Sequence, residues 1–302
     1  MKILFASEIE KPDFWFPLLQ QALPKDQFVV EPDESVDIAL VATPPAGTFA
    51  RLNNLKLIQS LWMGVERLLA DPQLPSGVPL APLVDPGMVS AMAETVLAHV
   101  LDWHHHHYTY RRYQAEQKWF RHRQFLASDR TIGILGLGQL GSHVAGRLLQ
   151  LGFNVVGWSR RPKQLDGVRF FSDIEEMMGA TDALVCLLPL TDKTRGVINQ
   201  RTLGKMKPHG CVINVARGGH VVTADLLAAL DSGHLRHAYL DVFEQEPLPK
   251  ESPLWRHPGV TITPHTAALT EPRTAVPKIA ENVDRIRRGQ PALNLVDFEA
   301  GY

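Results

Sequence analysis

The sequence predicts an α/β protein built from two doubly wound parallel-sheet domains. Three observations support this fold class. The chain has 302 residues, which exceeds the usual size of one domain and leaves room for two cores. Apolar strand patterns alternate with helical patterns in each half, as in parallel βαβ units. In the second half, a Gly-x-Gly-x-x-Gly run follows the first apolar strand, where a helix should begin.

The first half of the chain contains five short candidate strands with helical stretches between them. They are Lys2–Ala6, Phe28–Val30, Asp37–Ala42, Lys56–Gln59 and Val78–Ala81. The stretch from Met88 to Arg112 follows Pro86-Gly87, is rich in Ala, Leu, Met and His, and lacks internal Gly and Pro. It predicts one long helix that joins the two domains.

The second half contains six candidate strands, which predict a six-stranded parallel sheet with crossover helices. They are Thr131–Leu135, Asn154–Trp158, Ala183–Leu187, Cys211–Val215, His237–Val242 and Val260–Thr263. One helix is expected to begin at Thr223 and end near Gly233. A last helix, Pro272–Arg288, could close back onto the first domain.

Composition and charge exclude several classes of protein. Apolar residues make up 45% of the chain and charged residues 21%, which argues against disorder. A formal net charge of −1 offers no basic surface for nucleic acid or an anionic membrane. No apolar run approaches the roughly 20 residues of a membrane span, and Glu8 and Glu10 come too early for a signal peptide. We therefore expect a cytoplasmic protein with no membrane or nucleic-acid partner, and with buried, reduced thiols at Cys186 and Cys211.

Four consecutive histidines, His104 to His107, lie in the expected long helix. Only side chains three or four residues apart share a helix face, so His104 and His107 are the one pair that could bind an ion together. No acidic neighbour completes a ligand set for that pair. We therefore expect no metal site, and interpret the run as a partly exposed helix face at a domain or subunit boundary.

The glycine run Gly136-Leu-Gly138-Gln139-Leu140-Gly141 has the spacing of a dinucleotide-binding turn. The first glycine of such a turn lets the backbone reverse, the second lets it approach a pyrophosphate, and the third lets the helix pack against its strand. The free N–H groups of the helix N-terminus then face the negative charge. Because glycine triplets also close ordinary loops, the prediction depends on the flanking strand and helix.

The residues after the second strand of this domain indicate which dinucleotide binds. NAD-selective turns usually place Asp or Glu there, about 20 residues beyond the glycines, to bind the ribose hydroxyls. This chain instead has Ser159-Arg160-Arg161-Pro162-Lys163, which supplies cations. No carboxylate repels a 2′-phosphate at this point, and arginine binds phosphate in planar, bidentate geometry. The sequence therefore predicts NADP(H) in preference to NAD(H), the alternative being a solvated basic loop.

Five further segments complete a specific pattern. They are Leu187-Leu188-Pro189-Leu-Thr-Asp-Lys-Thr194-Arg-Gly196, Val212-Ile-Asn-Val215-Ala216-Arg217-Gly-Gly, Leu240-Asp241-Val-Phe-Glu-Gln-Glu246-Pro-Leu-Pro, Ile262-Thr-Pro-His265-Thr-Ala-Ala and the closing Val296-Asp-Phe-Glu-Ala-Gly-Tyr302. Over essentially its full length the chain resembles the D-2-hydroxyacid dehydrogenase family, and within it the glyoxylate/hydroxypyruvate reductase A group.

The resemblance implies a Rossmann NAD(P)-binding domain, residues 98–271, inserted into a flavodoxin-like substrate domain, residues 1–97 and 272–302. It also implies a homodimer, and a cleft with a catalytic Arg, Glu and His. The matching residues are Arg217, Glu246 and His265. The implied cofactor site adds Leu188, Pro189, Thr194, Val215, Ala216 and Asp241 to the glycine turn and the arginines.

These three residue types suit the reduction of a 2-oxo acid, which needs a cation for the carboxylate and a proton donor for the ketone oxygen. Arg217 supplies the cation, and the imidazole of His265 can give and take back a proton. Glu246 would orient that ring and stabilise its charged form. Glu244 competes for this role, but Glu246 directly precedes Pro247 as in the family pattern, so Glu244 is expected to face solvent.

One segment departs from the family pattern. The resemblance implies that backbone N–H groups of Leu61-Trp62-Met63-Gly64-Val65-Glu66 bind the substrate carboxylate, as a nest of N–H groups binds an anion. The family usually has Gly and Ala where this chain has Trp62 and Met63, so the pocket is expected to be narrower, more apolar or differently shaped. Trp62 is either a core side chain or a screen beside the substrate. In relatives, the region matching Gln117-Lys-Trp119-Phe120 forms a dimer arm that can lend an aromatic to the neighbouring pocket.

Several functions fit the sequence. The leading one is NADPH-dependent reduction of small 2-oxo acids, such as glyoxylate or hydroxypyruvate, to D-2-hydroxy acids. A variant of it is a reductase specific for a larger apolar acid. A nucleotide-sensing binding protein, like the C-terminal-binding co-repressors, is a different class. The sequence lacks disordered extensions and keeps the Arg, Glu and His, which favours an enzyme. Formate oxidation would usually use NAD, and the arginine-rich loop argues against it.

Overall fold

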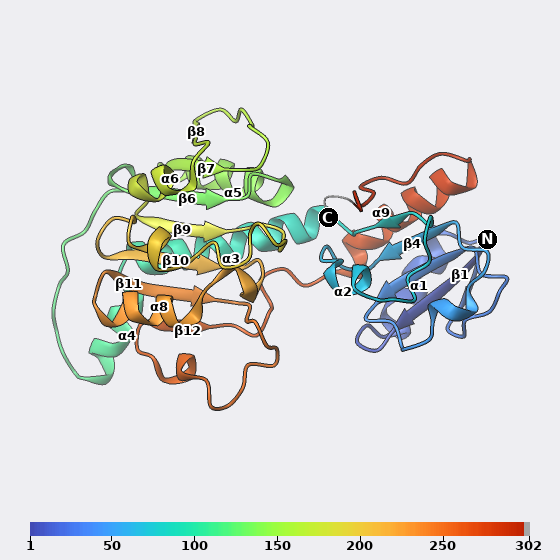
Figure 1. Ribbon diagram of the computed structural model, residues 1–302, viewed down its shortest axis with the longest axis horizontal. Helices are drawn as coiled ribbons and strands as arrows, with labels where there is room; N and C mark the ends of the chain where they lie inside the picture. The colour runs from blue at the N-terminus through green and yellow to red at the C-terminus, as the bar shows by residue number, and fades with distance from the viewer. Residues whose placement is uncertain (299–302) are drawn as a thin grey trace. The chain divides into compact units, whose positions relative to one another are not determined.

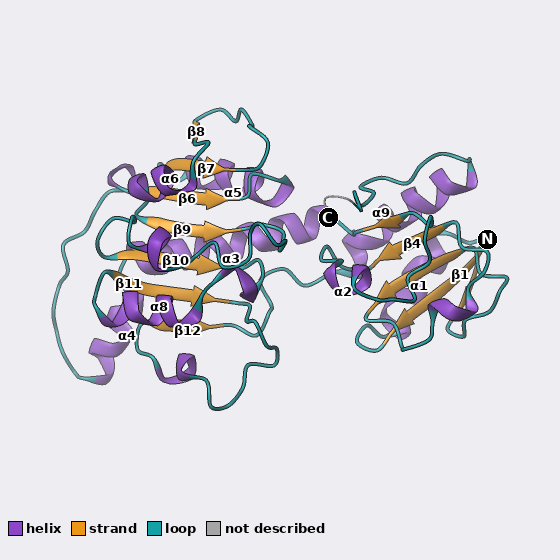
Figure 2. Ribbon diagram, viewed as in Figure 1, coloured by secondary structure: helices purple, strands orange, loops and turns teal. Residues whose placement is uncertain are grey.

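The protein is described by a computed structural model, which places residues 1–298; the end of the closing segment lies outside these described residues. The chain divides into two compact units (Figure 1). One comprises Met1–Met88 and the segment from Leu269 onward, and the other comprises Val89–Ala268. Each unit is a parallel β-sheet with helices packed on it (Figure 2).

The first unit has a five-stranded parallel sheet in the order β2-β1-β3-β4-β5. Its strands are β1 (Lys2–Ser7), β2 (Gln27–Val29), β3 (Ile38–Ala42), β4 (Leu57–Ser60) and β5 (Leu80–Ala81). Every residue of β3 is buried, as expected for a parallel strand with both faces covered. Helices α1 (Pro12–Ala22) and α9 (Pro272–Arg287) pack into the same apolar cluster on the sheet, and a short α2 (Glu66–Leu69) follows β4.

The second unit has a seven-stranded parallel sheet in the order β12-β11-β10-β9-β6-β7-β8. Its strands are β6 (Thr131–Leu135), β7 (Asn154–Trp158), β8 (Val168–Phe170), β9 (Ala183–Cys186), β10 (Gly210–Asn214), β11 (Leu235–Leu240) and β12 (Val260–Ile262). The prediction of six strands was wrong because it missed β8. This edge strand has only three residues, none of them buried, so it carries almost no apolar signal.

The helices of this unit cover both faces of its sheet. They are α3 (Pro86–His104), α4 (His107–Ala115), α5 (Gln139–Gln150), α6 (Ile174–Ala180), α7 (Gln200–Leu203) and α8 (Thr223–Asp231). Helices α6, α7 and α8 share one apolar cluster with the sheet, and Figure 1 shows α3 on the opposite side. Strand β7 lies beside β6 on one side, and β9, which comes later in the chain, lies beside β6 on the other side. The strand order therefore reverses at β6. Ligands of such sheets bind at the carboxyl ends of the strands where the order reverses.

The prediction of a single helix from Met88 to Arg112 was also wrong, because the structure has two helices there. Helix α3 ends at His104, and His106 takes a left-handed backbone with a φ of 59°, which an α-helix cannot continue. The His104 ring is buried edge-on against Phe153, with 5.1 Å between ring centroids, and burial lowers its pKa to about 4. The histidine run therefore marks a helix break rather than one partly exposed face.

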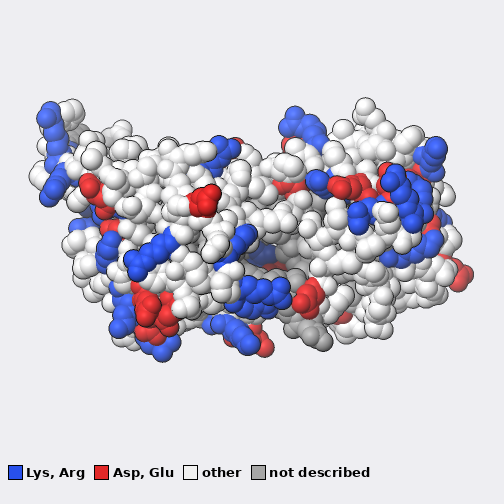
Figure 3. Space-filling view, turned by 90° about the horizontal axis from the view of Figure 1, so that it is seen from above, with Lys and Arg blue, Asp and Glu red and all other residues white. Residues whose placement is uncertain are grey.

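Other expectations concern the surface and the thiols. Within the described residues, no helix is long and apolar enough to cross a membrane, and no group of three or more His, Cys, Asp or Glu side chains could hold a metal ion. Cys186 and Cys211 are buried, free thiols, as predicted. On the face drawn in Figure 3, basic and acidic side chains are interspersed.

Candidate active site

The glycine turn joins β6 to α5 at the point where the strand order reverses. Gly136 has a φ of +100°, a conformation that L side chains rarely adopt. A Cβ on Gly141 would lie 1.8 Å from the carbonyl oxygen of Gly136. Backbone conformation and packing therefore require glycine at both positions.

Gly138 differs, because no protein atom beyond its chain neighbours lies within 4 Å of where its Cβ would be. Packing within the described residues thus does not demand a glycine, and the backbone stays open to a ligand. Gly138 precedes α5, whose first residues are Gln139 and Leu140, and the first N–H groups of a helix have no partner inside it. An open backbone beside a helix N-terminus fits the pyrophosphate of a dinucleotide.

The predicted phosphate clamp follows β7. Arg160 and Arg161 are exposed, and the hydroxyl of Ser159 donates a hydrogen bond to the carbonyl oxygen of Arg161 at 2.7 Å. This bond fixes the bend that carries the two arginines. Both arginines follow the end of β7, a strand of the same sheet that carries the glycine turn.

Lys163 brings a further cation to the glycine turn. Its Nζ donates hydrogen bonds to the carbonyl oxygen of Leu137 and to the hydroxyl of Ser142, both at 2.9 Å. The sequence analysis placed Lys163 among the cations that follow this strand. Its bonds to the glycine turn could not be predicted, because they depend on tertiary structure.

Two loops bring the remaining predicted cofactor residues to the same edge of the sheet. Leu188, Pro189 and Thr194 follow β9, and the Thr194 hydroxyl donates to the carbonyl oxygen of Pro189 at 2.8 Å. Val215 and Ala216 are buried directly after β10. Because β9 lies between β6 and β10, both loops lie on the same side of the glycine turn.

The structure places Glu246, rather than Glu244, against His265. Nδ1 of His265 lies 2.7 Å from Oε2 of Glu246, while the other carboxylate oxygen accepts the backbone N–H of Phe243 at 2.9 Å. The carboxylate is thus held from both sides and can orient the ring. About half of the His265 side chain is exposed, and its Nε2 is the nitrogen that does not face Glu246. Glu244 is 76% exposed and pairs with Arg195 at 3.8 Å.

Asp241 holds the turn that carries His265. Its carboxylate accepts hydrogen bonds from the Thr263 hydroxyl at 2.6 Å and from the backbone N–H groups of Thr266 at 2.9 Å and Ala267 at 3.0 Å. Its own carbonyl oxygen accepts the N–H of His265 at 2.8 Å. The sequence analysis placed Asp241 in the cofactor site, whereas these bonds give it a part in positioning His265.

Arg217 follows β10, the neighbour of β11 in the sheet. Asn214 donates to the carbonyl oxygen of Arg217 at 2.9 Å, which fixes the backbone there. The next residue, Gly218, approaches the Phe243 backbone so closely that a Cβ would lie 1.8 Å from its carbonyl carbon. The loop of Arg217 therefore packs directly on the segment that leads to Glu246.

His220 is a buried residue of this site that the sequence analysis missed. Its Nδ1 lies 3.0 Å from the carbonyl oxygen of Arg217, and its Nε2 lies 3.3 Å from that of Pro189. The ring thus links the Arg217 loop to the predicted cofactor loop. A histidine three residues after an arginine gives no sign of this, because Pro189 is distant in sequence.

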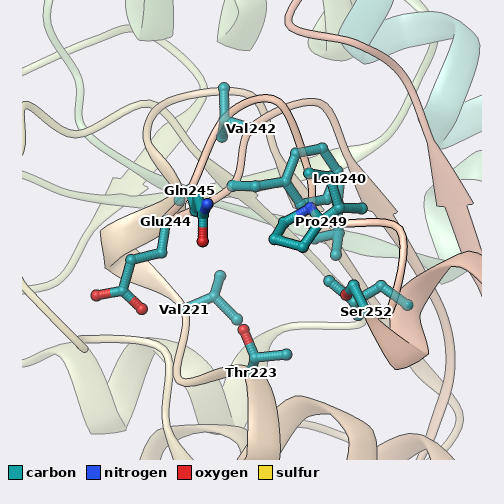
Figure 4. A pocket seen from close by; sticks show the side chains of 12 residues that line it. Val221, Thr223, Leu240, Val242, Glu244, Gln245, Pro249 and Ser252 are labelled. Carbon is teal, nitrogen blue, oxygen red and sulfur yellow. The ribbon is translucent and has the colours of Figure 1, made fainter.

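A small cavity of about 100 Å³ adjoins the Glu246 segment (Figure 4). Its lining includes Val221, Leu240 and Pro249, with Glu244 and Gln245 on one side. Sites for small molecules usually measure about 300 to 1,000 Å³, so this cavity is too small for a dinucleotide. Arg217, Glu246 and His265 do not line it.

The predicted substrate residues Trp62, Met63 and Gly64 follow β4 in the first unit. The backbone N–H of Trp62 donates to the Ser60 hydroxyl at 3.0 Å. Among the described residues, no group accepts a hydrogen bond from the N–H of Met63, Gly64 or Val65. Successive available N–H groups in a turn can form an anion-binding nest, so these three groups are candidates for one.

Comparisons with known proteins identify the family. A family model described as D-isomer specific 2-hydroxyacid dehydrogenase, NAD binding domain, matches residues 97–267. The glyoxylate/hydroxypyruvate reductase A proteins of Serratia proteamaculans and Photorhabdus laumondii are 41% and 38% identical to the chain, each over the full length of both proteins.

Solved structures that resemble this chain belong to the same family. A D-isomer specific 2-hydroxyacid dehydrogenase from Xanthobacter autotrophicus Py2, in complex with NADPH and MES, has a TM-score of 0.96 at 43% identity, covering 100% of this chain and 99% of that one. An NADPH-dependent glyoxylate/hydroxypyruvate reductase from Sinorhizobium meliloti, in complex with NADP and sulfate, has a TM-score of 0.94 at 34% identity, with the same coverage. The chain therefore belongs to the D-isomer specific 2-hydroxyacid dehydrogenase family.

Proposed function

We propose that this protein is a reductase that converts small 2-oxo acids, such as glyoxylate or hydroxypyruvate, to D-2-hydroxy acids with NADPH. The observation that carries the proposal is the contact of 2.7 Å between His265 and Glu246, beside the Arg217 loop, at the carboxyl edge of a dinucleotide-binding sheet. The full-length relatives named glyoxylate/hydroxypyruvate reductase A support the substrate class.

NADP(H) is the preferred cofactor. Open backbone at Gly138 receives the pyrophosphate, and Arg160 and Arg161 bind the 2′-phosphate through their guanidinium groups. The Xanthobacter and Sinorhizobium structures, which contain NADPH and NADP, support this preference. Bound there, NADPH supplies the hydride that reduces the ketone carbon.

The side chains of this chain do the remaining chemistry. Arg217 binds the carboxylate of the 2-oxo acid and polarises its ketone. His265 gives the proton on Nε2 to the oxygen that becomes the hydroxyl, and takes it back in the reverse direction. Glu246 is a positioning residue that keeps Nδ1 protonated and compensates the charge of the ring, as its contact with that nitrogen supports.

The N–H groups of Met63, Gly64 and Val65 add hydrogen bonds to the substrate carboxylate. Their availability among the described residues supports this role. Trp62 precedes them directly, so we include it among the substrate residues.

The enzyme acts as a homodimer. Support comes from the segment after α4, where Trp119 is 90% exposed and Leu126 is 71% exposed, since exposed apolar side chains of this size favour burial against a partner. Light scattering after size-exclusion chromatography tests the dimer. Twice the mass of the chain is expected, and a Trp119→Ser, Leu126→Ser variant should shift toward monomer.

Turnover by the purified protein tests the function. NADPH and NADH are each supplied with glyoxylate, hydroxypyruvate, pyruvate and a larger apolar 2-oxo acid. NADPH oxidation is expected with the first two acids, at a higher kcat/KM than with NADH. The absence of oxidation with every acid would overturn the proposal, and would favour a binding protein on the same fold.

A further inference from the structure

Glu10 joins two indole rings in the first unit. Its Oε1 accepts the indole N–H of Trp62 and its Oε2 accepts that of Trp15, each at 3.1 Å. Both oxygens of one carboxylate are therefore occupied by tryptophan side chains. Bonds with a charged acceptor are stronger than those between neutral groups, so the carboxylate can hold both rings firmly.

Glu10 is anchored from the side of the core. It lies just beyond β1, where the Ser7 hydroxyl accepts the backbone N–H of Ile9 at 3.1 Å and that of Glu10 at 2.8 Å. Trp15, its second partner, is fully buried between α1 and the sheet. The position of the carboxylate is thus set by the fold rather than by Trp62.

Trp62 is consequently fixed at three points. Its N–H donates to Ser60, its carbonyl oxygen accepts the N–H of Leu83 at 3.0 Å, and its indole donates to Glu10. The side chain is half-buried, with one side packed against the core of the unit. The remaining surface of the indole forms a rigid apolar wall.

Trp62 is followed directly in the chain by Met63, Gly64 and Val65, whose N–H groups are available among the described residues. Consecutive Cα atoms lie about 3.8 Å apart, so an acid bound at these groups is within one or two residues of the indole. A 2-oxo acid carries its variable substituent on the carbon next to the carboxylate. That substituent is therefore close to Trp62 when the carboxylate is bound there.

We propose that Trp62 determines specificity by limiting the size of this substituent, and that Glu10 is the positioning residue that holds the indole in place. The inference rests on the proposed function, and it narrows the substrate class to 2-oxo acids whose substituent is no larger than hydroxymethyl. A mobile indole could move aside for a larger group. The bond to Glu10 prevents this movement.

A double-mutant cycle tests the proposal in the full-length enzyme. The ratio of kcat/KM for 4-methyl-2-oxopentanoate to that for glyoxylate is measured with NADPH for wild type, Trp62→Ala, Glu10→Ala and the double variant. The ratio does not depend on how much of a variant is folded. A single methylene changes such ratios about tenfold or more, so Trp62→Ala should raise it at least about tenfold.

Glu10→Ala should raise the ratio by a smaller factor, and should add nothing once Trp62 is alanine. Trp255→Phe is the matched control, because it removes an indole hydrogen bond, to the Pro249 carbonyl oxygen at 2.9 Å, from an exposed ring in the other unit. It should leave the ratio unchanged.

Two results would overturn this inference while leaving the proposed function intact. One is an active enzyme whose ratio is the same with Trp62→Ala. The other is a Glu10→Ala effect of equal size with and without Trp62, which would show that Glu10 does not act through the indole. A wild-type enzyme that reduces neither acid overturns the proposed function itself.

Discussion

At the level of single residues, the chemistry depends on the two contacts that the Glu246 carboxylate makes. Glu246 uses one oxygen to accept the backbone N–H of Phe243 and the other to contact His265. The first bond orients the carboxylate, and the second orients the ring. The sequence predicted this pair because the motif placed Glu246 before Pro247. It could not predict Glu10 or His220, whose partners Trp62 and Pro189 are distant in sequence and meet them only after folding.

Glu246→Gln should lower kcat for glyoxylate reduction by at least about tenfold. The amide can still contact the ring but carries no charge to stabilise its protonated form, so the pH above which reduction declines should also move down. Glu244→Gln is the control, because Glu244 is exposed and contacts Arg195 instead of His265. Profiles of kcat against pH for the three enzymes measure this. Identical profiles for wild type and Glu246→Gln would refute the role.

Arg160→Ala should raise the apparent KM for NADPH roughly ten- to a hundredfold. This change corresponds to the free energy lost with one charge-assisted hydrogen bond. NADH has no 2′-phosphate, so its KM should change little. Initial rates at saturating glyoxylate, with each cofactor varied in turn, provide the comparison. Equal effects on both cofactors would show that Arg160 does not recognise the 2′-phosphate.

At the level of elements, buried strands with continuous apolar runs were predicted to within one or two residues, as at β6 and β7. The three-residue edge strand β8 and the break between α3 and α4 were not. The break lies at His106, and neither Gly nor Pro marks it. Beside the break, the His104 ring packs on Phe153, a tertiary contact that local sequence does not encode.

Helix α5 offers a direct comparison of two glycines. Gly141→Ala should lower the free energy of unfolding by roughly 1 to 3 kcal/mol, because its Cβ would overlap the Gly136 carbonyl oxygen. Gly146→Ala should raise it by about 0.5 to 1 kcal/mol, because that exposed position has open space and alanine favours helix. Urea unfolding of both variants measures the difference. A Gly141→Ala variant as stable as Gly146→Ala would contradict the account of the turn.

At the level of the whole molecule, the two parallel sheets follow from the alternation of strands and helices, and the second of them has the reversal in strand order that places a ligand site. The residues predicted for the second unit gather at one edge of its sheet because parallel strands end there together. What the sequence left open was which groups position them. The positioning contacts lie between loops and involve Asp241, His220 and Lys163. Such contacts cannot be predicted from residue spacing along the chain.

The reduction of hydroxypyruvate with NADPH, followed by chiral analysis of the product, tests the central claim most directly. Wild-type enzyme should form D-glycerate, and His265→Gln should form it about a hundred- to ten-thousandfold more slowly, because it lacks the proton donor. Failure of the wild-type enzyme to consume NADPH, formation of L-glycerate, or an undiminished rate with His265→Gln would contradict the account.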